Sequence, residues 1–239
     1  MKWIMGYAAA LCVLVLIISQ SIIIPTFFTP FFRWHFNRAE VAAEIGIRDD
    51  DLMHVTHELL AYMRGRRDSL HGITAEVQGP HERGNRIYGQ NFFTDREITH
   101  MYDVRELYDL LFMTRNISLF SLIALIFAMI YFRHKPLELL SRCSREVLVG
   151  FFILMLAVAG ISAIDFSRAW DIFHYIFFFR DADQTWRLTR FVDLMINMFP
   201  LEFFISISIF IAALITIFSA LICTFSSVYL YKHRGARND

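Results

Sequence analysis

The chain has 239 residues, of which 56% are hydrophobic and 19% are charged, and its formal net charge is zero. Balanced charge argues against a nucleic-acid partner, which requires clustered excess cation, while the high apolar content indicates a membrane protein. None of the three cysteines (Cys12, Cys143 and Cys223) falls in a longer loop. The sequence therefore predicts no disulfide framework and no exported thiol nucleophile.

Four stretches are long and apolar enough to cross a membrane, whose hydrocarbon core requires about 20 apolar residues. They are residues 1–24, where the apolar run starts at Trp3, and residues 116–132, 147–164 and 203–231. We interpret the first as a retained anchor rather than a signal peptide, because its apolar run is long and ends in Pro25 without a small-residue cleavage site.

The connections between these stretches predict the orientation of the chain. Residues 133–146 and the tail 232–239 are short and rich in Lys and Arg, which is typical of cytoplasmic segments. Both termini are then cytoplasmic, and residues 25–115 and 165–202 lie outside.

The first outer segment contains signals for a helix and a hairpin. Asp49, Asp50 and Asp51 begin a helix that reaches about Met63, with a buried stripe formed by Leu52, Val55, Leu59 and Met63. Residues 72–78 alternate as a strand, and residues 86–88 suit the returning strand. The predicted fold class is a mainly α membrane protein: a four-transmembrane-helix bundle with a small extracytoplasmic α/β cap, residues 25–115.

The segment 93–114 predicts an amphipathic helix that leads into the second span. Thr94 and Glu97 have the spacing of a capping box at its start. His100 falls on the stripe that should face a buried surface, with Asp103 three residues later. A carboxylate at this spacing can orient a histidine and make it more basic.

The second outer segment, residues 165–202, is too interrupted by charge to span a membrane and too aromatic for a solvated linker, so we expect an aromatic loop. Its aromatic residues suit a membrane interface or a buried cleft: Trp170, Phe173, Tyr175, Phe177, Phe178, Phe179 and Trp186. His174 lies among them. An apolar setting disfavours the imidazolium, so His174 should stay neutral and available as a base.

Two motifs resemble one known family. THMYDVRELY, around His100, is similar to its His-Met-x-Asp-Val-basic signature, and FHYIFF, around His174, to its Phe-His-x-x-Phe-Phe signature. Trp186, Asp193, Pro200 and Phe203-Phe204 follow its closing pattern. On these motifs the chain resembles the lipoprotein intramolecular transacylases, four-span bacterial membrane proteins.

The resemblance implies an acyl shift in the bacterial cell membrane, catalysed on the extracytoplasmic face. The sn-2 acyl chain of a diacylglyceryl-modified lipoprotein would move to the α-amino group of its N-terminal cysteine. It implies that His100 and His174 are catalytic, with His100, oriented by Asp103, as principal base. The supporting residues would include Tyr102, Arg115, Arg168 and Trp170. Membrane lipids would be partners, and neither a metal nor a cofactor is called for.

Two other classes of function stay open. His54, His57 and Glu58 share a helix face and suggest a metal-dependent membrane hydrolase, although a solvated polar face has the same pattern. The chain also suits a non-enzymatic membrane sensor or assembly protein, in which both motif histidines are packing residues.

Overall fold

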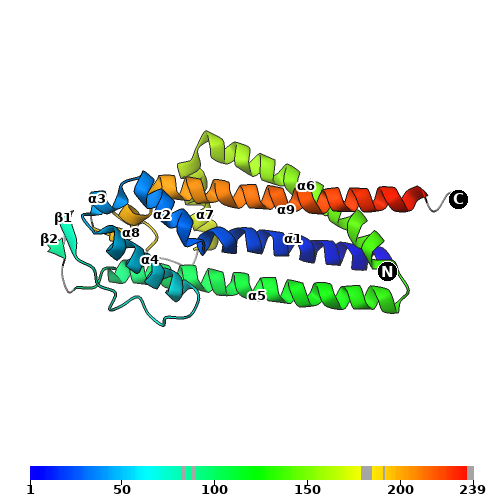
Figure 1. Cartoon of the computed structure of the whole chain (residues 1–239), viewed down its shortest axis with the longest axis horizontal. Coiled ribbons are helices and arrows are strands. Elements are labelled where there is room, and N and C mark those ends of the chain that lie inside the picture. The colour runs from blue at the N-terminus through cyan, green and yellow to red at the C-terminus, as the bar shows by residue number, and fades with distance from the viewer. Residues whose placement is uncertain (82–83, 88–89, 179–184, 191, 236–239) are drawn as a thin grey trace. The chain divides into compact units, whose positions relative to one another are not determined.

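The computed structural model describes residues 1–81, 84–87, 90–178, 185–190 and 192–235 (Figure 1). The described chain is mainly helical, as the sequence predicts. In chain order the elements are α1 (Lys2–Thr26), α2 (Thr29–Arg38), α3 (Val41–Ile45), α4 (Asp49–Met63), β1 (Val77–His81), β2 (Gly84–Ile87), α5 (Asp95–Tyr131), α6 (Pro136–Ile164), α7 (Phe166–Phe177), α8 (Leu194–Met198) and α9 (Leu201–Gly235).

The chain divides into two compact units. The first, which we call the bundle unit, comprises Met1–Ile24, Leu110–Phe166 and Ser208–Asp239. The second, which we call the outer unit, comprises Pro25–Asp109 and Ser167–Ile207. Helices α5 and α9 begin in the outer unit and end in the bundle unit.

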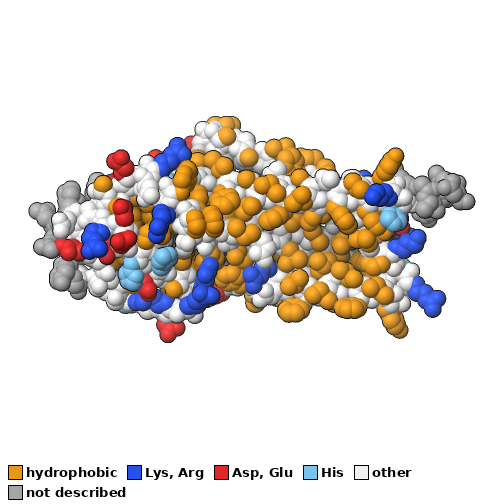
Figure 2. All heavy atoms as spheres, in the orientation of Figure 1, with side chains coloured by type: hydrophobic (Ala, Val, Ile, Leu, Met, Phe, Trp, Pro, Cys, Tyr) orange, Lys and Arg blue, Asp and Glu red, His pale blue; other side chains and the backbone are white. Residues whose placement is uncertain are grey.

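The bundle unit is made of apolar helices. Helices α1, α5, α6 and α9 are each long and apolar enough to cross a membrane, which confirms the four predicted spans. In α5 the charge-free part follows Arg115. Only 6% of the residues in the most apolar windows of α5 and α6 are buried within the protein, and Figure 2 shows hydrophobic side chains covering the visible face of these helices. Such outward apolar faces suit lipid, not water.

Two apolar clusters hold the bundle unit together. Ala9, Met129 and Leu139 join α1 to α5 and α6. Ile17 and Leu148 pack with Ile215 and join α1 to α6 and α9. Burial of these side chains provides the packing that lipid contact alone does not supply.

Segments expected to connect the spans are themselves partly helical. Helix α6 begins at Pro136, so most of residues 133–146 is helical, and proline is favoured at the first helical position because it lacks an N–H. The expected aromatic loop 165–202 contains α7 and α8.

The outer unit consists of helices and one two-stranded hairpin. Helix α4 has the predicted bounds, and its predicted stripe is buried. Strand β1 pairs antiparallel with β2, but it starts at Val77, not at Gly72 as the alternation predicted. The carbonyl of Ile73 instead accepts a hydrogen bond of 2.7 Å from Phe92 N–H, so this part of the chain pairs with a loop.

One glycine allows α3 to approach the hairpin. Gly46 has a φ of 75°, which disfavours a side chain, and a Cβ atom there would lie 1.3 Å from the Gln78 carbonyl oxygen. Gln78 N–H donates a 2.7 Å hydrogen bond back to Gly46 O. This contact connects α3 to β1.

Candidate functional site

The start of α5 forms the predicted capping box. Glu97 Oε2 accepts a hydrogen bond of 2.6 Å from Thr94 N–H, and Thr94 Oγ1 accepts one of 3.3 Å from Glu97 N–H. These bonds use backbone donors that a helix start leaves without partners. Because they set the direction of the first turn, they also set the face on which His100 lies.

His100 lies inside the outer unit, as its position on the apolar stripe predicts. Its side chain is 8% exposed. The ring lies 5.2 Å, centroid to centroid, from that of Phe178, which directly follows α7. His100 therefore packs against an aromatic residue from the second outer segment.

His174 lies near the end of α7 and is 5% exposed. Its Nδ1 atom is 2.8 Å from the main-chain oxygen of Trp170. Since a carbonyl oxygen only accepts hydrogen bonds, we assign the ring proton to Nδ1. In the neutral ring the lone pair is then on Nε2, which can act as a base.

Aromatic rings enclose His174 on several sides. Trp186 stacks on it with a centroid separation of 4.8 Å, and Trp170 meets it edge-on at 4.6 Å. Phe173 and Phe178 lie at 5.4 and 5.5 Å. This burial lowers the pKa of His174 below its usual 6.5, and the Trp170 hydrogen bond and the Asp171 charge only partly oppose it. His174 is consequently neutral at neutral pH.

The two motif histidines meet in the outer unit. Their ring centroids are 6.2 Å apart and the rings are tilted by 33°. The two rings are therefore close enough to act on one substrate group. Two imidazoles at one point can accept a proton from one atom and donate a proton to another.

The predicted supporting residues have different locations. Trp170 contacts His174, and Asp103 is half-buried one turn after His100. Tyr102 is 57% exposed, and Arg168 is also exposed. Arg115 belongs to the bundle unit, where its guanidinium donates to Asn116 Oδ1. Among these predicted residues, Trp170 is the one for which the structure shows a ring contact with a motif histidine.

Several residues around the site were given no catalytic or supporting role from the sequence. Phe178 contacts both imidazoles, and Trp186 stacks on one. Glu97 and Asp193 are buried carboxyl groups near the start of α5. The sequence signals were the aromatic content of the second outer segment for Phe178 and Trp186, and the closing pattern for Trp186 and Asp193. Neither signal reveals spatial neighbours.

The alternative histidine group on α4 is arranged differently. His54 and His57 are exposed, and Glu58 forms a 2.6 Å ion pair with Arg67. In the described part of the chain, no three His, Cys, Asp or Glu side chains are close enough together to hold a metal ion.

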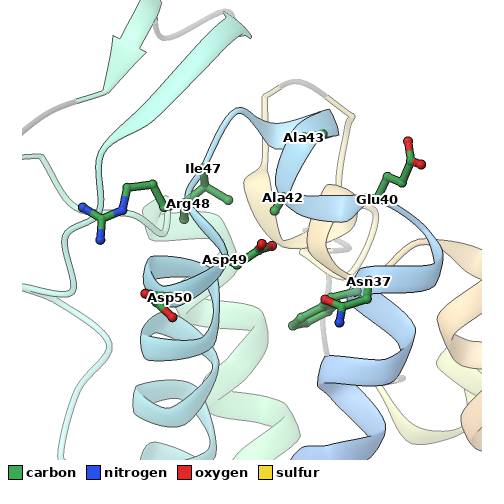
Figure 3. Close-up of a pocket in the computed structure, with 9 residues that line it drawn as sticks. Asn37, Glu40, Ala42, Ala43, Ile47, Arg48, Asp49 and Asp50 are labelled. Atoms are coloured by element: carbon green, nitrogen blue, oxygen red, sulfur yellow. The ribbon is translucent and has the colours of Figure 1, made fainter.

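A pocket of about 850 Å³ lies elsewhere in the outer unit, between α2, α3 and the start of α4 (Figure 3). Asn37, Glu40 and Asp49 are among the polar residues that line it. Neither His100 nor His174 lines this pocket, so it is separate from the histidine pair.

Comparison with family models gives one match, and comparison with curated proteins gives one relative. The family model described as lipoprotein intramolecular transacylase Lit matches residues 7–204. An uncharacterised protein of Aquifex aeolicus is 26% identical over 138 residues, and this match covers 56% of each chain. The chain thus matches little more than half the length of that relative.

Solved structures show the same fold. The membrane-integral lipoprotein intramolecular transacylase Lit from Bacillus cereus superposes with a TM-score of 0.74, covering 100% of this chain and 99% of the other at 15% identity. A variant of that protein with one histidine replaced by arginine gives a TM-score of 0.73 at 16% identity, covering 99% and 95% of the two chains.

Proposed function

The chain belongs to the lipoprotein intramolecular transacylase family, and we propose that it transfers the sn-2 acyl chain of a diacylglyceryl-cysteine to the α-amino group of that cysteine. The observation that supports this most is the buried pair of histidines with ring centroids 6.2 Å apart. The product is a lyso-form lipoprotein.

The reaction is an ester aminolysis and needs two proton transfers. The amine nitrogen attacks the ester carbonyl carbon, so a C–N bond forms while the C–O bond to the sn-2 oxygen breaks. One proton leaves the amine, and one proton reaches the departing alkoxide. Two groups of near-neutral pKa can perform both transfers, each typically worth about 10²–10⁴ in rate.

The hydrogen bonding of His174 leads us to assign it as the base. With Nδ1–H bonded to Trp170 O, its Nε2 lone pair can take the proton from the attacking amine. His100 then delivers a proton to the leaving oxygen, with Asp103 as its orienting carboxylate. This assignment reverses the order expected from the sequence, where His100 was the principal base.

The rings around His174 support transfer over hydrolysis. Trp170, Phe178 and Trp186 surround the imidazole. Apolar walls exclude water, which competes with the amine for the ester. They also suit the acyl chain and the glyceryl moiety of a lipoprotein.

We assign the outer unit to the extracytoplasmic side of the bacterial cell membrane. The short turn between α5 and α6 and the C-terminal tail carry the Lys and Arg residues that favour the cytoplasm. In Figure 2 basic side chains gather at the end of the bundle unit where the N-terminus lies. The substrate, a membrane-anchored lipoprotein, is modified on the opposite side.

Mass spectrometry of lipoprotein N-terminal peptides tests the proposal. Purified protein in lipid nanodiscs, incubated with a diacylglyceryl lipopeptide, should give a product of unchanged mass in which the amine is acylated and the glyceryl group keeps one chain. His100→Ala and His174→Ala should abolish it, whereas His57→Ala, which changes an exposed histidine, should not. Peptides that keep a free α-amine with the wild-type protein would rule out acyl transfer.

A further inference from the structure

Two buried carboxyl groups meet at one hydroxyl at the start of α5, the helix that carries His100. Glu97 is 0% exposed and Asp193 is 2% exposed. Thr94 Oγ1 lies 2.9 Å from Glu97 Oε2 and 3.0 Å from Asp193 Oδ1. The proposed acyl transfer uses neither carboxyl group.

Both carboxyl groups also accept hydrogen bonds from backbone N–H groups. Glu97 accepts N–H hydrogen bonds from Thr94 at 2.6 Å and from Met195 at 2.5 Å. Asp193 Oδ2 accepts one from Thr189 N–H at 2.8 Å. The two groups therefore connect the start of α5 to the segment that follows α7.

A count of hydrogens shows that this arrangement needs an extra proton. The Thr94 hydroxyl has one hydrogen, so it can donate to only one of the two carboxyl groups. If both were ionised, the other short oxygen–oxygen contact would have no hydrogen between its atoms. With one carboxyl group protonated, that group donates to Thr94 Oγ1, and the Thr94 hydroxyl donates to the other.

We propose that Glu97 and Asp193 share one proton through Thr94, and that this bridge positions His100 against His174. The bridge ties Asp193 to the first turn of α5, three residues before His100. Asp193 Oδ2 also holds Thr189, which lies three residues after Trp186, the ring stacked on His174. Its effect on catalysis rests on the proposed function, whereas the shared proton does not.

The electrostatic setting is consistent with a shared proton. Burial raises the pKa of Glu97, which lies in the first turn of α5 well ahead of the membrane span, to about 7, and the nearby Asp193 charge adds to this. Asp95 and Arg96, on the same helix, are exposed. Arg190, on the facing segment, pairs with Glu44.

The hydrogen-bond pattern distinguishes the two carboxyl groups. Both Glu97 oxygens accept backbone N–H groups, as a carboxylate does, while Asp193 Oδ1 has the Thr94 hydroxyl as its partner. Asp193→Asn should therefore mimic the protonated state, because its amide N–H₂ can donate to Thr94 Oγ1 and its oxygen can accept from Thr189 N–H. In Glu97→Gln the amide N–H₂ would face a backbone N–H.

Infrared difference spectroscopy in nanodiscs tests the shared proton directly. The wild-type protein should show the carbonyl stretch of a buried carboxylic acid in mild acid and lose it in alkali. Asp193→Asn should lack this band, and Asp95→Asn, which changes an exposed carboxyl group in the same turn, should keep it. Absence of the band from the wild type, or its persistence in both Asp193→Asn and Glu97→Gln, would overturn the proposal.

Rates of acyl transfer test the positioning role. Thr94→Val, which removes the bridge, and Glu97→Gln should each lower the rate by about tenfold to hundredfold, since small displacements of reacting groups have such effects. Thr94→Ser should restore it. The wild-type rate should decline in alkali, where the shared proton is lost, and Asp193→Asn should be active without this decline. Full activity of Thr94→Val, or loss of activity in Asp193→Asn with retention in Glu97→Gln, would contradict the assignment. A wild type with the infrared band but no acyl transfer would refute the proposed function alone.

Discussion

The Nδ1 atom of His174 lies 2.8 Å from the main-chain oxygen of Trp170, four residues earlier in α7. This one contact orients the imidazole and leaves Nε2 directed away from its own helix turn. Aromatic rings from α7 and from the segment after it surround the same ring. The hydrogen bond within α7 thus determines which tautomer of His174 is present, and burial among the aromatic rings keeps its imidazole neutral.

The titration of His174 follows from this environment. Burial disfavours the imidazolium, so the pKa is lowered from the usual 6.5. Because the unfolded chain then binds the proton more tightly than the folded one, the stability due to neutral His174 is present above pH 6.5 and is lost as pH falls through the lowered pKa. NMR of ring-labelled histidine, assigned with His174→Phe, should show a midpoint below 6.5. A midpoint at or above that value would contradict it.

Replacing either motif histidine by phenylalanine should separate chemistry from packing. Phenylalanine keeps a ring among the aromatic side chains, so His174→Phe and His100→Phe should fold and unfold at temperatures close to wild type. Acyl transfer should fall by at least about 100-fold, the typical effect of removing a general acid or base. Thermal unfolding in detergent and mass spectrometry of the lipopeptide provide the two measurements. Unchanged rates in both variants would favour a packing role for the histidines.

Removal of Trp186 should shift the reaction from transfer to hydrolysis. Its ring stacks on His174 at 4.8 Å, so Trp186→Ala should admit water to the imidazole and increase the release of free fatty acid relative to N-acylated product. Trp186→Phe keeps an aromatic wall and should change this ratio less. The ratio is measured from the same lipopeptide incubation. If the alanine variant releases no more fatty acid than wild type, Trp186 does not exclude water.

Alanine substitutions at two glycines should test how much the contact between α3 and the hairpin contributes to stability. Gly46→Ala would combine a left-handed backbone with a clash against Gln78 O and should destabilise the protein by about 3 kcal/mol or more. Gly72 also has a left-handed backbone, with φ of 77°, but nothing lies within 4 Å of an added Cβ. Gly72→Ala should therefore cost only about 1–2 kcal/mol. Equal losses in chemical denaturation would show that the clash is relieved without cost.

Local patterns were sufficient for much of the fold. The four apolar stretches, the bounds and buried stripe of α4, and the capping box at Thr94 all follow from interactions within a few residues. Apolar length, helical periodicity and capping chemistry are properties of neighbours in the chain, so the sequence shows them directly. The start of β1 was predicted wrongly, since it depends on a loop partner at Phe92.

By itself, the sequence determined that the chain is a helical membrane protein, and its motifs pointed to His100 and His174 as the residues of interest. Only the tertiary structure decided that the two imidazoles are 6.2 Å apart, that Phe178 contacts both while Trp186 stacks on His174, and that Glu97 meets Asp193 at Thr94. These contacts join residues far apart in the chain. Their formation depends on how α5 packs with α7 and the segment after it, and no local pattern encodes that packing.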